Sequence, residues 1–239
     1  MCRRSQRGLL LCTVAAVCAG AAGQEENSAP KVDVHLQIQL PAQSGRSHKP
    51  PAVVWLKPLG DDAPPIPQDD SHYTLLQKNR MFTPHLLVVP VGSKVYFPNA
   101  DPFFHNVFSL FNGKRFDLGL YEAGTTKVET FSREGVSYIF CNIHPEMSAV
   151  VVVLGTRYYA VADAGGAIHI RDVPTGSYEM HVWVEGLTQP ALNRLVHRVQ
   201  VPAGSGDLGV VDASSSPLQS TGHLNKFGQS YDRDSKPAY

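Results

Sequence analysis

A thiol, an imidazole and a thioether lie within seven residues of one another in the segment 141–147, at Cys141, His144 and Met147. A soft thiolate, a ring nitrogen and a weak thioether form a ligand set that suits copper cycling between its two oxidation states. Such a site also needs a second imidazole from elsewhere in the chain, and we expect His105 to supply it. With these four ligands the protein would carry single electrons rather than make or break bonds.

The first 23 residues have the layout of a secretory signal peptide. Basic residues precede an apolar run over residues 9–19, and small residues follow it. The run is too short to span a bilayer. The adjacent Arg3 and Arg4 leave open export by the twin-arginine route, after folding, as an alternative to the general route. The sequence therefore predicts an exported protein, either periplasmic or secreted.

Removal of this leader would leave Cys141 as the single cysteine, since the other three of the four cysteines lie inside it. In an oxidising compartment an unpaired thiol is a liability, so its presence calls for a reason. Ligation of a metal is one such reason. The alternative is a buried, inert cysteine that acts as a small apolar residue. Because a histidine and a methionine follow so closely, we favour the metal ligand.

Composition and charge exclude several function classes. The chain has 239 residues and is 43% hydrophobic, which is enough for one ordinary core or two small ones. Without the leader, 18 Lys and Arg stand against 21 Asp and Glu, so the sequence shows no basic face for nucleic acid. After the leader no segment is long and apolar enough for a membrane helix, and we predict no membrane span.

The hydropathy pattern is that of β-strands almost throughout. Apolar and polar residues alternate over 32–40, and a short apolar run at 52–56 predicts a second strand. A Pro- and Asp-rich linker over 60–70 separates these from a series of short strands punctuated by glycines, which ends in the apolar run 149–154. Short strands at this spacing predict an all-β protein built as a Greek-key sandwich or barrel.

This scaffold would position the candidate ligands. Cys141 ends one predicted strand, Met147 lies just before the next, and His144 sits in the turn between them. His105 can reach that end of the sandwich only through tertiary folding. A site held by a rigid sandwich changes shape little when the metal changes charge, and this favours fast electron transfer.

The ligand loop and an upstream motif carry a family resemblance. Cys-Asn-Ile-His-Pro-Glu-Met at 141–147 resembles the Cys-x-x-His-Pro-x-Met loop of amicyanin-type cupredoxins, and Asp-Pro-Phe-Phe-His-Asn-Val at 101–107 resembles their upstream ligand motif. The resemblance covers residues 80–154. It implies one type 1 copper ion with His105, Cys141 and His144 as in-plane ligands and Met147 as a long axial ligand. It also implies that the side chain of Asn106 ties the two ligand loops together.

A second resemblance concerns the flanking segments. Residues 156–163 and 166–178 are similar to the second half of a carboxypeptidase-regulatory or transthyretin-like β module, and the strands over 32–57 to its first half. The copper domain would then be inserted into that module, as in exported plastocyanin-like proteins labelled methylamine-utilisation proteins. The predicted parts are a signal peptide (1–23), N-terminal accessory strands (31–57), the copper domain (72–154), the rest of the accessory module (155–202) and a polar tail, disordered or loosely docked (203–239).

The resemblance implies a soluble electron carrier that docks briefly with redox proteins such as a c-type cytochrome or a dehydrogenase. His144 would expose a ring edge beside Pro145, near Phe103 and Phe104, and this small patch would serve for docking. Catalysis is disfavoured, because Phe140 and Asn142 flank the cysteine where copper enzymes of related fold use histidines. Copper handling or sensing, and partner binding by the accessory module, stay open as alternatives.

The remaining histidines have simpler interpretations. His85 could approach the site, although a position at the start of a strand is the more ordinary interpretation. We expect His169, His181 and His197 at the surface of the accessory module.

Overall fold

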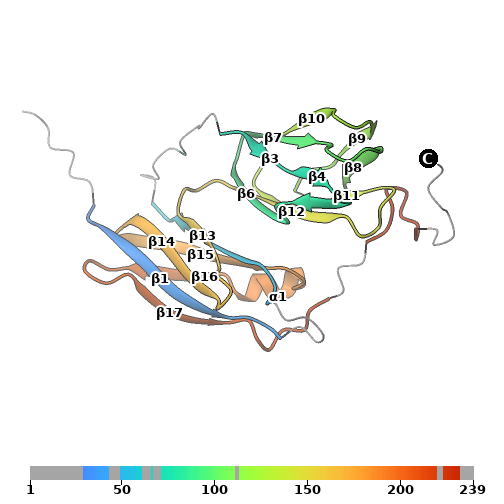
Figure 1. The fold of residues 1–239 in the computed structure, drawn as a ribbon. Helices are drawn as coiled ribbons and strands as arrows, with labels where there is room; N and C mark the ends of the chain where they lie inside the picture. Colours follow the sequence, from blue (N-terminus) through green and yellow to red (C-terminus); the bar gives the residue numbers. More distant parts are fainter. Residues whose placement is uncertain are drawn as a thin grey trace, which may run out of the picture.

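The computed structural model describes residues 29–42, 49–60, 66, 71–110, 113–219 and 223–231, so the predicted leader lies outside the described residues. Within them the chain forms 17 β-strands and one short helix, and the predicted all-β class is confirmed. Figure 1 shows two β bodies, one above the other. No helix in the described part of the chain has the length and apolar character needed to cross a membrane.

The lower body in Figure 1 is built from two separate parts of the described chain, residues 31–58 and residues 159–212. One of its sheets has the strand order β14-β1-β17, and the other has the order β13-β2-β15-β16. These elements are β1 (Lys31–Gln39), β2 (Ala52–Pro58), β13 (Tyr159–Val161), β14 (Ala167–Pro174), β15 (Gly176–Val184), α1 (Gln189–Arg194), β16 (His197–Val201) and β17 (Asp207–Asp212).

The upper body is formed by the residues between β2 and β13. Its main sheet has the order β6-β12-β11-β8-β9, and a second sheet has the order β10-β7-β3. The elements are β3 (Tyr73–Thr74), β4 (Leu76–Lys78), β5 (Met81–Thr83), β6 (Leu86–Pro90), β7 (Ser93–Pro98), β8 (His105–Ser109), β9 (Phe116–Tyr121), β10 (Thr126–Phe131), β11 (Gly135–Cys141) and β12 (Ser148–Leu154). This body is therefore inserted between strands that pair with each other, since β2 pairs with both β13 and β15.

Strand β12 is buried on both faces and joins the two bodies. Val151 and Val153 belong to the core of the upper body, together with Cys141 and Met147. Val150, Val152 and Leu154 alternate with them and pack into the core of the lower body. A strand covered on both faces has no polar side, which explains why residues 149–154 form an unbroken apolar run.

The prediction that the chain from residue 203 onward is a disordered or loosely docked tail is wrong for residues 207–212. These residues form β17, which lies parallel to β1 with Ile38 opposite Val211. The side chains of Val211 and Ala213 are buried against the lower body. The apolar residues of this short strand are interrupted and flanked by Gly, Ser and Asp, so the period-two pattern is too weak to be recognised in the sequence.

The close approach of β17 to β1 gives a test of this correction. A Cβ atom on Gly206 would collide with the carbonyl oxygen of Asp33 in β1. We expect Gly206→Ala to lower the free energy of unfolding by about 2 kcal/mol, because the backbone must shift to make room. Gly60→Ala is the matched control, since a Cβ at Gly60 meets nothing within 4 Å. Equal stability of the two variants in urea denaturation would contradict the observed packing of β17.

Candidate metal centre

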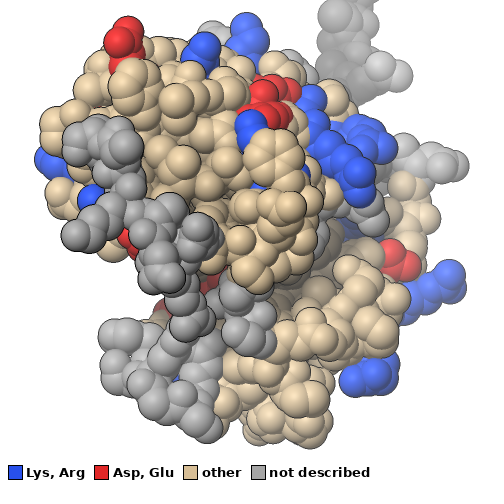
Figure 2. Space-filling model, turned by 90° about the vertical axis from the view of Figure 1, so that its right-hand side faces the viewer, with Lys and Arg blue, Asp and Glu red and all other residues tan. Residues whose placement is uncertain are grey.

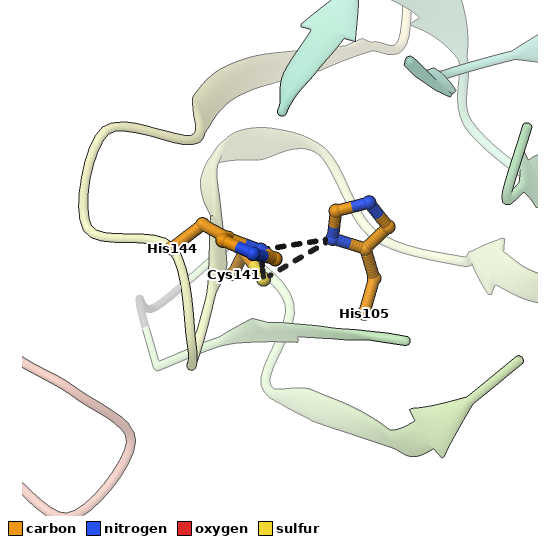
Figure 3. Close-up of side chains that lie close together, drawn as sticks. All are labelled: His105, Cys141 and His144. Atoms are coloured by element: carbon orange, nitrogen blue, oxygen red, sulfur yellow. Dashed lines mark hydrogen bonds between the residues drawn. The ribbon is translucent and has the colours of Figure 1, made fainter. Parts of the chain in front are cut away.

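Three donor atoms converge at one end of the upper body, from His105, Cys141 and His144 (Figure 3). The Sγ atom of Cys141 lies 3.5 Å from Nδ1 of His144 and 3.7 Å from Nδ1 of His105. The two Nδ1 atoms lie 3.2 Å apart. Among the described residues, no other group of three or more His, Cys, Asp or Glu side chains brings its donor atoms close enough together to hold one metal ion.

The dimensions of this triangle fit a first-row transition metal. A point equidistant from three corners with these separations lies about 2.0 Å from each of them, close to ordinary metal–nitrogen and slightly below metal–sulfur bond lengths. Two imidazole nitrogens and one sulfur also match the in-plane set of a blue-copper site. The residues therefore fit the copper ion that the sequence implies.

Sheet register brings His105 and Cys141 together. His105 is the first residue of β8 and Cys141 is the last of β11, and these antiparallel strands place Val107 opposite Cys141. Because residues two apart in a strand share a face, His105 lies diagonally across from the cysteine on the same side of the sheet. The sheet therefore delivers two donors from segments 36 residues apart in the sequence.

A short turn between β11 and β12 adds the third donor. The turn is closed by two main-chain hydrogen bonds, from Met147 N–H to His144 O (3.0 Å) and from Cys141 N–H to Met147 O (3.3 Å). Met147 itself is fully buried in the same core as Cys141. The turn thus holds the imidazole of His144 close to the thiol of Cys141, and it ends at a methionine that is buried in the same core as the cysteine.

The three donors lie in a dry pocket. His105 and Cys141 are fully buried and His144 is 3% exposed. Burial lowers the pKa of both imidazoles and raises the pKa of the Cys141 thiol, although backbone N–H groups at the sulfur oppose that rise. Without a metal the pocket therefore favours neutral rings and a neutral thiol.

Asp101 sets the orientation of the His105 ring, and sequence reasoning missed it. Its carboxylate lies 2.9 Å from Nε2 of His105 and accepts hydrogen bonds from the N–H groups of Asn79 (2.6 Å) and Arg80 (3.0 Å). A carboxylate on Nε2 keeps the proton there and leaves the lone pair of Nδ1 facing the other two donors. The available signal was an acidic residue four positions before the candidate ligand.

The turn that binds Asp101 is itself unusual. Asn79 and Arg80 connect β4 to β5 with φ angles of 55° and 56°, the left-handed conformation of a tight two-residue hairpin. Burial opposes ionisation of Asp101, but the hydrogen bonds from Arg80, His105 and Asn79 outweigh it and lower the pKa of the carboxyl. The charged carboxylate accepts hydrogen bonds from both N–H groups of the hairpin and so stabilises its left-handed backbone.

Asn106 links the two ligand-bearing segments, but not in the predicted way. Its carbonyl oxygen accepts a hydrogen bond from the N–H of Asn142 (3.0 Å), next to the ligand cysteine. Its side-chain amide instead donates to Asp117 in β9 (2.6 Å). A register shift between Asn106 and Phe108 in the pairing of β8 with β9 accompanies this orientation. The prediction that the side chain ties the ligand loops together is therefore wrong, because the main chain does so.

The expected exposure of the His144 ring edge is also wrong. Phe103 covers both imidazoles, with ring centroids 5.3 Å from His105 and 5.5 Å from His144. The guanidinium carbon of Arg80 lies 5.3 Å from the centre of the Phe103 ring. Phe104 is 43% exposed. The surface over the cluster is therefore formed by phenylalanine rather than by the ligand itself.

Four further histidines, His85, His169, His181 and His197, lie outside the donor cluster. His85 contacts Glu185 (2.9 Å) and the carbonyl oxygen of Ser148 (3.1 Å), so it links the two bodies. His169 and His197 are exposed, and His181, half-buried, pairs with Glu179 in the lower body.

Comparisons with solved structures find copper proteins of cupredoxin type. A purple cupredoxin from Nitrosopumilus maritimus is 26% identical, with a TM-score of 0.31 over 34% of this chain and 99% of that one. A mutant of amicyanin is 22% identical, with a TM-score of 0.34 over 36% of this chain and 85% of its own. A copper-containing nitrite reductase from Thermus scotoductus is 23% identical, with a TM-score of 0.34 over 38% of this chain and 25% of that one.

One protein-family model matches the chain. It is described as domain II of polysaccharide lyase family 4 and matches residues 147–207, from the start of β12 to the start of β17. This is a different β family from the carboxypeptidase-regulatory or transthyretin-like module that the sequence resembles, so that resemblance stays a prediction. None of the curated proteins matches this chain.

The role of Asp101 can be tested by replacing it with its amide. Asp101→Asn replaces one carboxylate oxygen with an NH2 group, which cannot accept the hydrogen bonds that Asn79, Arg80 and His105 donate. We therefore expect the affinity for Cu(II) to fall roughly 10- to 100-fold. The control is Asp163→Asn, because that carboxylate also accepts two backbone N–H groups, from Gly165 and Ala167, but in an exposed turn of the lower body. Chelator competition measures both affinities, and equal affinities would exclude this role.

The buried imidazoles predict a pH dependence of the metal-free protein. Burial places the pKa of His105 and His144 below the ordinary value of 6.5, so the unfolded chain binds protons that the native state does not. Their contribution to stability is complete above pH 6.5 and is lost as the pH falls, by at most about 1.4 kcal/mol per pH unit for each ring. His144→Gln should therefore show a shallower fall in urea denaturation between pH 7 and 5. Identical slopes would contradict the shift.

Proposed function

We propose that this protein binds one type 1 copper ion and carries single electrons between redox partners. The observation that carries the proposal is the triangle of one sulfur and two imidazole nitrogens, buried and sized for a metal. His105, Cys141 and His144 would hold the ion through one sulfur and two ring nitrogens. Met147, buried in the same core as Cys141, would add the weak thioether contact typical of such sites.

The chain supplies the conditions that a carrier needs. A bound copper ion would contribute its one-electron couple, and the protein residues keep the coordination shell fixed. The sheet register fixes His105 and Cys141, the closed turn fixes His144, and Asp101 fixes the ring of His105. Because these groups are already in place, little rearrangement accompanies a change of charge at the metal.

We propose that the protein is not an enzyme. The donors are buried, with Phe103 over both imidazoles. The residues that flank Cys141 are Phe140 and Asn142, neither of which can pass electrons to a second copper as a ligand would. These features support transport of electrons rather than chemistry on a substrate. Export to the periplasm or the medium follows from the leader-like residues 1–23 and belongs to the same proposal.

The proposed partners are redox proteins such as a c-type cytochrome or a dehydrogenase. Phe103, half-buried over both imidazoles, and the exposed Phe104 would form a small apolar contact near the metal. Figure 2 faces the side of the molecule at the right of Figure 1, where uncharged side chains form most of the described surface. Such a surface suits brief contacts, which typically bury less than about 1,200 Å².

The experiment that tests the proposal is the optical and paramagnetic-resonance spectrum of the purified protein with Cu(II). We expect an intense blue or green colour from the bond between thiolate and copper. Cys141→Ser should abolish the colour and leave the unfolding transition of the metal-free protein in place, because Cys141 is a small buried residue. Weak absorption with a spectrum of nitrogen and oxygen ligands alone would overturn the proposal.

Reversible cycling separates a carrier from a copper-handling protein. A carrier should be reduced and reoxidised repeatedly by a cytochrome while retaining its metal. A protein that hands over copper should instead bind Cu(I) far more tightly than Cu(II) and lose the metal to an acceptor.

A further inference from the structure

Residues 223–231 lie against the loop that carries the ligand cysteine, and we refer to them as the C-terminal clasp. The clasp holds three consecutive residues of that loop, the cysteine and its two neighbours. The contacts are a stack of the His223 ring on the ring of Phe140 (4.0 Å between centroids, 23° between planes), a hydrogen bond from the Tyr231 hydroxyl to the carbonyl oxygen of Cys141 (2.8 Å), and one from the N–H of Lys226 to the side-chain oxygen of Asn142 (2.9 Å).

The same clasp also reaches the segment that carries the other ligand. The ammonium group of Lys226 lies 2.8 Å from the carboxylate of Asp117 in β9. That carboxylate accepts the side-chain hydrogen bond of Asn106, the residue after His105. The clasp therefore connects to both ligand-bearing strands, β11 directly and β8 through Asp117, although 84 to 109 residues separate its partners in the sequence.

The clasp has internal order of its own. The side chain of Asn225 accepts hydrogen bonds from the N–H groups of Phe227 and Gln229, and Gly228 adopts the left-handed φ of 77° that closes the turn. The ring of Tyr231 meets the ring of His223 edge-on at 5.2 Å, and its hydroxyl lies 3.1 Å from Nδ1 of that histidine. These bonds shape the segment so that its lysine, histidine and tyrosine face the loop together.

We propose that Tyr231 is a positioning residue of the metal centre, which fixes the main chain of Cys141 through its hydroxyl. This inference rests on the proposed function, since it concerns how the thiolate ligand is held. Strand β11 ends at Cys141, where ladder hydrogen bonding gives way to the turn, and the Tyr231 hydroxyl bonds the carbonyl oxygen at that point. A ligand must be held to within about 0.5 Å of its working position, and its own main chain determines where its sulfur lies.

The chemistry of the tyrosine suits this role. The hydroxyl lies 2.8 Å from the carbonyl oxygen of Cys141, and because a carbonyl oxygen can only accept, the phenol is the donor of this bond. The thiol of Cys141 is fully buried, so the surrounding loop must open before solvent or a reagent can reach it. Loss of one hydrogen bond that holds the closed loop should therefore make opening more frequent.

The test compares two variants that each lose one tyrosine hydroxyl. Tyr231→Phe removes the bond to Cys141, and the matched control Tyr178→Phe removes a bond of the same length, 2.8 Å, to the carbonyl oxygen of Pro174 in the lower body. In the metal-free full chain, a maleimide labels Cys141, and peptide mass spectrometry measures the rate. We expect Tyr231→Phe to label about five-fold faster than wild type, and Tyr178→Phe to label at the wild-type rate.

A second measurement uses the copper-loaded protein. Tyr231→Phe should lose copper to a chelator several-fold faster and change the hyperfine splitting in the paramagnetic-resonance spectrum, whereas Tyr178→Phe should match wild type in both. If Tyr231→Phe does not fold, Lys226→Met weakens the same clasp and should shift the labelling rate in the same direction. Wild-type labelling by the folded variants would overturn the inference. Absence of a blue spectrum in wild type would overturn the proposed function alone, because the labelling comparison needs no metal.

Discussion

The antiparallel pairing of β8 with β11 is the constraint on which the donor cluster depends. With Val107 opposite Cys141, the imidazole of His105 lies on the same face of the sheet as the thiol and within reach of it. A slip of one residue would turn every side chain of the strand to the other face and separate the two donors. The buried Val107 and Phe108 of β8 and the buried Ile139 and Phe140 of β11 stabilise this register, so packing in the core indirectly fixes the geometry at its edge.

Around this register the polar groups form successive layers. His105 and His144 meet the sulfur, Asp101 holds the back of one ring, and the hairpin turn at Asn79 and Arg80 holds Asp101. The clasp bonds the cysteine loop and Asp117. Hydrogen bonds from Arg80, Asn79 and His105 stabilise the charged form of the buried Asp101 carboxylate. A negative charge therefore lies next to the ring of His105.

Local spacing in the sequence was sufficient to predict part of this arrangement. Cys141, His144 and Met147 share one turn, so seven residues predict their proximity, and the period-two pattern predicts the strands that flank it. Tyr231 was not predictable in this way, because its contact with Cys141 joins segments 90 residues apart. Asp101 left a local signal, four residues before His105, but that spacing alone does not show that the carboxylate reaches the ring. The burial of His144 was missed because the motif at 101–107 places Phe103 near this ring without showing that the Phe103 side chain lies over it. The clasp shows no periodicity in the sequence, and its partners lie far upstream.

The double burial of β12 limits how the two bodies can be used apart. In sequence, residues 73–154 form one continuous insertion and resemble a cassette that could be cut out and transplanted. In space, excision would leave Val150, Val152 and Leu154 facing water as an apolar stripe on the central part of a sheet. Exposed stripes of this kind drive association between molecules. The lower body thus acts as a solubilising cover for the upper one, and any minimal version of this protein must keep both.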